Sequence, residues 1–152
     1  MRKPDLIIGP AENPQTLRWH LLRVRGVQVA LHRWCRSDSD RALHDHTADN
    51  ISILLWGRYR EHFSHAWQPP GHPAHLKPRI RWPLIPYFRK AETPHRVELH
   101  RGRVWSLWIR FKPRREWGFH CQKGWTHWRN YVAERGDYYL NGTSTVGRGC
   151  DE

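Results

Sequence analysis

The chain has 152 residues, the length of one domain with a core large enough to fold without disulfide or metal support. No apolar run approaches the roughly 18 residues of a membrane span. The basic N-terminus is not followed by a hydrophobic segment of signal-peptide length. We therefore expect a cytoplasmic protein with no membrane partner. The formal net charge of +12 comes mostly from arginines spread along the whole chain, which does not favour specific nucleic-acid binding, although any basic surface attracts polyanions.

The first half of the chain predicts an all-β fold. Three prolines make residues 1–15 an extended lead-in. Gly26 and Gly57 each separate two runs of β-forming residues and predict two hairpins. The predicted strands are residues 16–25, 27–36, 43–56 and 59–65. Residues 43–56 form either one long strand or two strands with a bend.

A proline-rich segment follows these strands. Residues 68–86 contain six of the 11 prolines, which interrupt a regular ladder, so we expect a long loop across one end of the domain. Residues 79–82 are expected to form a short extended piece. A loop of this length is either a lid or a rigid structural excursion, and the prolines favour rigidity. His72 and His75 are more typical of a solvated loop than of a second metal site.

The strand pattern returns after the loop. Trp108 and Arg110 share one face of the last strand, and the sequence does not decide whether that face points inward. A turn at residues 101–103 places this strand beside the preceding one. The predicted strands are residues 88–91, 96–100 and 104–111.

The C-terminal part has a different composition. Residues 114–128 are dense in aromatic and ionisable side chains and predict a strand and loop that close one end of the domain. Residues 128–134 predict one or two helical turns, and residues 135–152, with four glycines and many small polar side chains, predict a mobile tail. The globular domain is expected to span residues 16–134. An odd number of cysteines without a Cys-x-x-Cys pair predicts free thiols at Cys35, Cys121 and Cys150.

Two histidines in the third strand carry the strongest chemical signal. His44 and His46 are two residues apart, so both side chains point to the same face of a β-strand. His95 follows a proline just before a later strand. Neutral imidazoles suit iron, copper, nickel and zinc, whereas calcium and magnesium prefer oxygen ligands. The three histidines therefore predict a transition-metal site. Asp45, between the first two, is expected to be a surface or strand-pairing carboxylate on the opposite face.

This pattern resembles the first motif of the cupin superfamily, roughly Gly-x5-His-x-His-x3,4-Glu-x6-Gly. His44 and His46 are followed after three residues by Asn50 and after six more by Gly57. The segment Thr93-Pro94-His95-Arg96-Val97-Glu98-Leu99 looks like the second motif, which supplies one more histidine. The resemblance covers about residues 30–110. It implies the cupin jelly-roll barrel, a double-stranded β-helix.

Two departures from the cupin pattern modify the expected site. Asn50 stands where the family usually has a glutamate ligand, and the leading glycine is absent. The site therefore resembles the three-histidine variant, as in cupin thiol dioxygenases and diketone-cleaving dioxygenases. Asn50 is expected to orient a ligand or to bind the metal weakly, and Asp49 replaces the glutamate only if a bulge re-aims the strand. The C-terminal Trp-Gly-Phe and Gly-Trp-x-His-Trp motifs also resemble uncharacterised bacterial and phage cupin-like proteins.

The resemblance to three-histidine cupins implies iron(II) as the cofactor, with zinc, nickel and manganese as alternatives. Three histidines leave positions on iron(II) for a substrate and dioxygen, which implies an oxidation of the dioxygenase type. With zinc, the same ligands would activate water for hydrolysis or polarise a carbonyl for isomerisation. The alternative hypothesis is a non-catalytic cupin-like protein that binds a polyanion, such as nucleic acid, or a sugar.

Further candidates surround the expected pocket. Tyr59, Arg110 and Trp117 are the predicted substrate contacts, and His127 is the predicted catalytic base. The guanidinium fork of an arginine matches a carboxylate or a phosphate, so the substrate is expected to be small and anionic. An exposed strand edge would also allow a homodimer.

Overall fold

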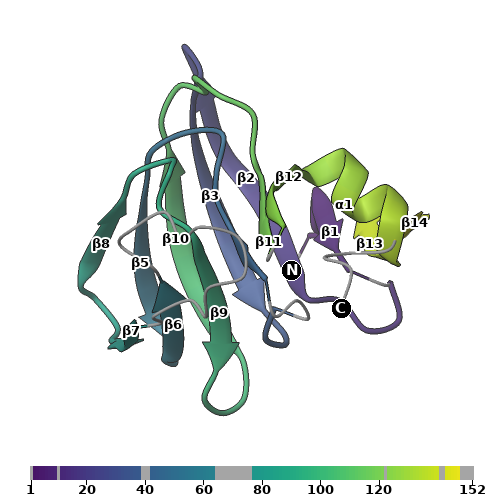
Figure 1. Ribbon diagram of the computed structural model, residues 1–152. Coiled ribbons are helices and arrows are strands. Elements are labelled where there is room, and N and C mark those ends of the chain that lie inside the picture. Colours follow the sequence, from purple (N-terminus) through teal and green to yellow (C-terminus); the bar gives the residue numbers. More distant parts are fainter. Residues whose placement is uncertain are drawn as a thin grey trace.

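Two antiparallel β-sheets pack against each other in the computed structural model (Figure 1). The predicted all-β class is confirmed, because one short helix accompanies the strands in the described part of the chain. In these residues no helix has the length and apolar character that crossing a membrane requires. The structure describes residues 2–9, 11–38, 42–63, 77–121, 123–140 and 143–147.

The larger sheet has eight strands in the order β14-β13-β1-β2-β3-β10-β5-β8. The predicted hairpin around Gly26 joins β2 to β3, with positive φ angles of 47° at Arg25 and 84° at Gly26. In chain order the strands are β1 (Leu6–Ile8), β2 (Thr16–Val24), β3 (Val27–Trp34), β5 (Asn50–Trp56), β8 (Pro86–Arg89), β10 (Val104–Arg110), β13 (Gly136–Leu140) and β14 (Thr143–Gly147).

The smaller sheet has six strands in the order β12-β11-β4-β9-β6-β7. Gly57 precedes β6 with a φ of 79°, and a Cβ atom there would lie 2.8 Å from the carbonyl oxygen of Arg103, so only glycine fits. In chain order the strands are β4 (Leu43–His44), β6 (Tyr59–Phe63), β7 (Lys77–Arg81), β9 (His95–Leu99), β11 (Gly118–Cys121) and β12 (Gly124–His127).

The predicted strand at residues 43–56 is divided between the two sheets. β4 ends at His44 in the smaller sheet, and β5 begins at Asn50 in the larger one. The five residues between them carry the chain across. The crossing separates the histidine pair from Asn50, although all three belong to one sequence motif.

The proline-rich region contains strands as well as a loop. Pro78 lies in β7 and Pro86 begins β8, and each of these strands is at an edge of its sheet. Proline is tolerated at an edge because its missing N–H removes no ladder bond there. Residues 68–76, with His72 and His75, lie outside the described part of the chain.

The C-terminal part contains a helix and a hairpin. The predicted helical turns correspond to α1 (Trp128–Arg135). The segment predicted as a mobile tail contains β13 and β14, and Ile8 of β1 pairs with Leu140 of β13. The sequence does carry a hairpin signal, because Asn-Gly at residues 141–142 stands between two short runs that contain tyrosine, threonine and valine. The glycine content of residues 135–152 led to the prediction of a tail instead. Cys35 is free as predicted, whereas Cys121 is disulfide-bonded, which corrects the expectation of free thiols.

The hydrophobic core joins the two sheets. Leu54 and Val104 come from the larger sheet, Tyr59 and Val97 come from the smaller one, and all four are buried. Tyr59 and Val97 also line a cavity between the sheets. The packed core and the cavity therefore share a wall.

Candidate metal centre

His44, His46 and His95 come together where β4 lies beside β9. His44 and His95 are opposite each other in the register of the two strands, and His46 follows in the segment that leaves β4. One ligand atom from each residue lies within 4.8 Å of the other two. The Nε2 atoms of His46 and His95 are 2.7 Å apart. The three predicted imidazoles thus form one cluster that fits a metal ion.

Buried carboxylates lie behind two of the histidines. His95 Nδ1 is 2.7 Å from Glu61 Oε1, and His44 Nδ1 is 4.0 Å from Asp38 Oδ2. When Nδ1–H faces a carboxylate, Nε2 keeps the lone pair that a metal needs. This geometry favours the tautomer of His95 that presents Nε2 to His46.

Glu61 belongs to a buried charge network. Arg89 and Arg81 both donate to its carboxylate, and only 1% of Glu61 is exposed. Burial opposes ionisation of the carboxyl group, but Arg89, His95 and Arg81 outweigh it and hold the pKa of Glu61 well below its usual value. The carboxylate is therefore ionised and fixed behind His95.

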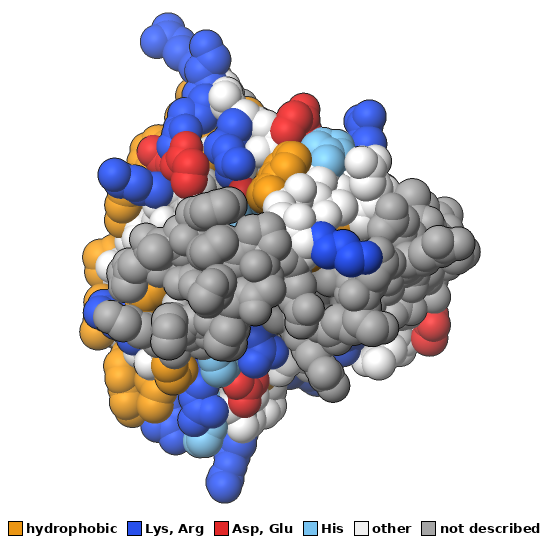
Figure 2. All heavy atoms as spheres, viewed as in Figure 1, with side chains coloured by type: hydrophobic (Ala, Val, Ile, Leu, Met, Phe, Trp, Pro, Cys, Tyr) orange, Lys and Arg blue, Asp and Glu red, His pale blue; other side chains and the backbone are white. Residues whose placement is uncertain are grey.

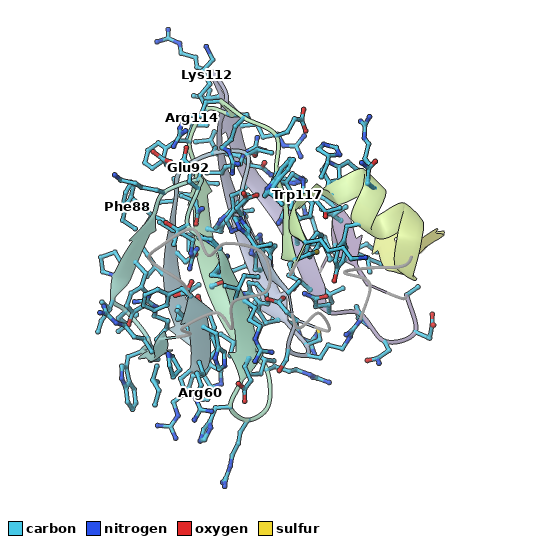
Figure 3. The ribbon with its side chains drawn as sticks, in the orientation of Figure 1. Arg60, Phe88, Glu92, Lys112, Arg114 and Trp117 are labelled. Carbon is cyan, nitrogen blue, oxygen red and sulfur yellow. The ribbon has the colours of Figure 1, made fainter. Side chains whose placement is uncertain are left out.

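Asn50 and Asp49 have separate places in the structure. Asn50 Oδ1 accepts from Arg89 Nη1 at 2.9 Å, so Asn50 acts on the triad through Arg89 and Glu61. Asp49 Oδ1 accepts from the backbone N–H of Ala91 at 2.7 Å and from Arg114 at 2.8 Å. Arg114 also pairs with Glu92, and Figure 3 shows these two side chains at one end of the molecule. Neither Asn50 nor Asp49 lines the cavity.

Asp45 is buried, which corrects the surface alternative of the expectation. It accepts hydrogen bonds from the Gly118 backbone at 2.7 Å and from Trp125 Nε1 at 2.9 Å, and it lies 2.8 Å from Arg115 and 3.2 Å from His120. Burial raises the pKa of this carboxyl group, but these contacts outweigh it and lower the pKa. Asp45 therefore fastens the β11–β12 hairpin to the backbone between two metal ligands.

All three histidines are neutral at physiological pH. Burial is the main cause, and it lowers the pKa of His44 to about 4 and that of His95 to about 4. The pKa of His46 is well below its usual value through burial and the neighbouring histidines. Neutral imidazoles carry free lone pairs, and three of them form a donor set suited to a transition metal.

The cavity between the sheets has a volume of about 260 Å³, and all three histidines line it. Tyr59, Arg110 and Trp117, the predicted substrate contacts, line it as well. His127 does not, because Nε2 of His127 lies 3.2 Å from Glu116 near the surface. The structure therefore brings the substrate candidates to the triad and leaves the catalytic candidate outside the cavity.

Comparison with known proteins identifies structures with a similar fold, but it does not identify a sequence family. No protein-family model and no curated protein matches the sequence. Hydroxypropylphosphonic acid epoxidase from S. wedmorenis is 14% identical, with a TM-score of 0.52, over 73% of this chain and 58% of the epoxidase. The iron(II) form of HppE, with the cupin fold, is 13% identical over 73% of this chain and 59% of its own, with a TM-score of 0.53.

The chain has the cupin fold, as HppE does. A cupin superfamily protein from Desulfitobacterium hafniense is also similar, with 18% identity, a TM-score of 0.49, and coverage of 64% of this chain and 78% of that one. The chain spans less than two thirds of the epoxidase length. Identities this low establish the fold alone.

The larger sheet of the cupin sandwich supplies a cationic wall. Arg18 Nε donates to Nε2 of His32 at 2.7 Å, and the Arg18 guanidinium lies 4.6 Å from the centre of the Trp108 ring. Arg110 Nε is buried, with no hydrogen-bond partner within the described residues. Burial and the nearby Arg23 lower the pKa of Arg110. Arg18, His32, Trp108 and Arg110 all line the cavity.

Several functional residues were missed by sequence reasoning. Glu61 follows Tyr59 at a spacing of two, so the inward position of Tyr59 is the signal that could have found it. Arg18 and His32 are opposite each other in the β2–β3 register and share the face of Trp108. Identifying them required knowing that Trp108 points inward, which one sequence does not decide.

Proposed function

We propose that the chain is a metal-dependent cupin enzyme that holds iron(II) with His44, His46 and His95 and oxidises a small anionic substrate. The observation that carries the proposal is a cluster of three neutral imidazoles at the wall of a cavity, with buried carboxylates behind two of them. HppE, which has a similar fold, has been solved with iron(II) and with cobalt(II).

Iron(II) is the metal that fits the proposed chemistry. Three protein ligands leave coordination positions free, and iron(II) supplies the redox chemistry that joins dioxygen to an organic substrate. With zinc, the same ligands would support hydrolysis or isomerisation instead. The neutral histidines accept either metal, so metal content and dioxygen consumption must be measured separately.

The cavity limits the substrate. Its volume of about 260 Å³ is below the roughly 300–1,000 Å³ of pockets for drug-sized ligands. A buried hydrogen-bond donor without an acceptor costs free energy, and an anionic ligand group that accepts from it removes that cost. Arg110 lines the cavity, and its Nε atom is buried with no hydrogen-bond partner among the described residues, so it favours a carboxylate or a phosphonate-like group.

Aromatic side chains complete the binding site. Trp108 and Trp117 line the cavity and provide flat apolar surfaces for the carbon skeleton of a substrate. Tyr59 is buried, and burial together with Glu61 raises the pKa of its phenol to about 12. Tyr59 is therefore a neutral group in the shared wall of the core and the cavity, able to donate a hydrogen bond.

Metal analysis of untagged protein tests the proposal. We expect about one equivalent of iron after reconstitution with iron(II) under anaerobic conditions, and loss of that metal in the His46→Ala and His95→Ala variants. Dioxygen uptake with a panel of small carboxylates and phosphonates then tests the oxidation. Folded wild-type protein that takes up no metal would instead support the non-catalytic binding protein. Stoichiometric zinc without dioxygen uptake would support a hydrolase or isomerase.

A further inference from the structure

The turn that joins β7 to β8 presents an exposed leucine in an unfavourable backbone conformation. Leu84 has a φ of 65°, and 75% of the residue is exposed. A bulky side chain is uncommon in this left-handed region, where glycine and asparagine are accommodated most easily. Because so little of the side chain is buried, packing does not explain a leucine at this position. A strained and exposed apolar residue instead indicates a function for that side chain.

The neighbouring strands hold this turn in place. The backbone N–H of Leu84 donates to the carbonyl oxygen of Leu54 at 2.7 Å, and Pro83 forms a β-bridge with the same residue. The hydroxyl of Tyr87 accepts from the backbone N–H of Trp82 at 2.7 Å and lies 3.3 Å from its carbonyl oxygen. Leu84 is therefore presented on a fixed support, which lowers the entropy lost when the turn binds a partner.

Further exposed apolar side chains lie around Leu84. Because the turn is bonded to Leu54, the end of β5 lies beside it. Together with Leu84 we call these residues the apolar tip: Leu55, Trp56, Trp82 and Ile85, which are 45%, 72%, 47% and 48% exposed. Figure 2 shows hydrophobic side chains gathered at the lower left of the molecule, where Figure 1 places β6 and β7. Exposed apolar side chains that gather in one place mark an interaction site.

The segments that form the apolar tip carry basic side chains and no acidic ones. Residues 51–60 and 77–90, which include the whole tip, contain no aspartate or glutamate. The guanidinium of Arg58 lies 5.1 Å from the centre of the Trp82 ring. Arg103 is exposed, and its carbonyl oxygen lies close to Gly57, the residue that precedes Arg58. The tip therefore combines apolar side chains with positive charge.

This combination fits the surface of a bilayer that contains anionic lipids. Tryptophan side chains favour the level of the lipid headgroups, and aliphatic side chains favour the acyl boundary beneath them. Arginines near the surface attract acidic headgroups. A nucleic acid would use the rings and the arginines, but it offers no apolar surface to Leu55, Leu84 and Ile85. A second copy of the chain would bring like charges together, which opposes association.

We infer that the apolar tip and its arginines dock the protein on the surface of an anionic lipid bilayer, with Leu84 at the boundary between headgroups and acyl chains. Docking of this kind needs no membrane-spanning segment. It therefore goes beyond the expectation of no membrane partner, which considered only spanning and signal segments. The inference does not depend on the metal or on the proposed oxidation.

Co-sedimentation of the untagged chain with lipid vesicles tests the inference. Vesicles of phosphatidylcholine and phosphatidylserine should bind the wild-type chain, and vesicles of phosphatidylcholine alone should bind it about tenfold more weakly. Leu84→Asn should weaken binding to the anionic vesicles about tenfold, the effect expected for the loss of one buried leucine side chain. Since asparagine tolerates the left-handed conformation better, this variant should unfold at an unchanged or higher temperature.

Two matched controls separate the tip from the rest of the surface. Leu22→Asn changes a leucine that is 54% exposed on β2, outside the tip, and should bind vesicles like the wild type. Arg58→Gln should weaken binding about fivefold at low salt. Arg25→Gln, at the exposed turn between β2 and β3, should have a smaller effect.

Four results would overturn the inference. The first is a wild-type chain that does not bind the anionic vesicles. The second is binding that Leu84→Asn leaves unchanged, because that would be a general attraction between a basic chain and a polyanion. The third is a marked loss of stability in Leu84→Asn, which would mean that the leucine serves the fold. The fourth is binding of a single-stranded oligonucleotide without binding of vesicles, which would assign the tip to nucleic acid.

Discussion

Nδ1 of His95 and Oε1 of Glu61 lie 2.7 Å apart, and both side chains are buried. The two residues come from neighbouring strands, β9 and β6. The contact is on the Nδ1 side of the His95 ring, while Nε2 lies toward His46 and the cavity. It also links the triad to Arg89 and through it to Asn50.

Glu61→Gln should weaken metal binding by about 10–100-fold, because a neutral amide orients His95 less strongly and lowers its basicity. Competition with a chelator of known affinity measures the change. Glu98→Gln is the control, since Glu98 is on β9 in the same sheet but is 39% exposed and contacts His62 instead of the triad. Equal affinity of the Glu61→Gln variant and the wild type would contradict a role for Glu61 behind the metal.

Asn50→Ala should reduce metal affinity less than His46→Ala does. The amide of Asn50 contacts Arg89 at 2.9 Å and reaches the triad only through two further side chains. Metal content per folded chain, measured after dialysis, compares the two variants. Equal losses would mean that Asn50 is itself a ligand.

Arg110→Met should weaken the binding of small anions about tenfold, because it removes a cation that lines the cavity and whose buried Nε atom has no hydrogen-bond partner within the described residues. Inorganic phosphate and acetate are suitable probes in a thermal-shift titration. Arg23→Met is the control, since Arg23 is exposed and does not line the cavity. If both variants showed the same thermal shift with the anions, Arg110 would have no role in binding them.

The stability of the protein should fall below about pH 6.5 in part because of His32. Burial, helped by Arg18, holds the pKa of His32 well below 6.5 in the folded chain. The unfolded chain then binds a proton that the folded chain does not, at a cost of about 1.4 kcal/mol per pH unit. Above pH 6.5 both states are neutral and the effect vanishes.

The sign of this effect is tested with His32→Gln. Urea unfolding between pH 5 and 7.5 should show a shallower loss of stability on acidification than in the wild type. His100→Gln, at an exposed position, should keep the wild-type slope. A variant of His32 with an unchanged slope would show that the ring is protonated in the folded state.

Asp45→Ala should destabilise the chain by about 2–3 kcal/mol, because it leaves Gly118, Trp125 and Arg115 without their buried acceptor. Asp49→Ala, four residues away, should cost about 1 kcal/mol or less, since Asp49 is partly exposed and its ion pair with Arg114 is at the surface. Denaturant unfolding compares the two. A larger loss of stability in Asp49→Ala than in Asp45→Ala would contradict a structural role for the buried Asp45.

The sequence predicts some parts of this site well because they depend on local spacing. His44 and His46 at a spacing of two share a face on any strand, and the resemblance to cupin motifs brings His95 to them. The same spacing from Tyr59 places Glu61 on the inward face, but its contact with His95 depends on the pairing of β6 with β9. Asp38 and Arg18 could not be found from local spacing, since their roles depend on how distant segments pair. The buried place of Asp45 depends on β11, whose pairing with β4 joins residues more than 70 positions apart.

The metal ligands and the cationic side chains lie on opposite walls of the cavity, and this arrangement affects which substrates fit. The smaller sheet and the segment that leaves it carry the three histidines, and the larger sheet carries Arg18 and Arg110. Under the proposed function, the spacing between the sheets sets which atom of a bound acid reaches the metal. Homologous acids that differ by one methylene should then be oxidised at very different rates, and core residues between the sheets, such as Leu54, would determine substrate length without touching the substrate.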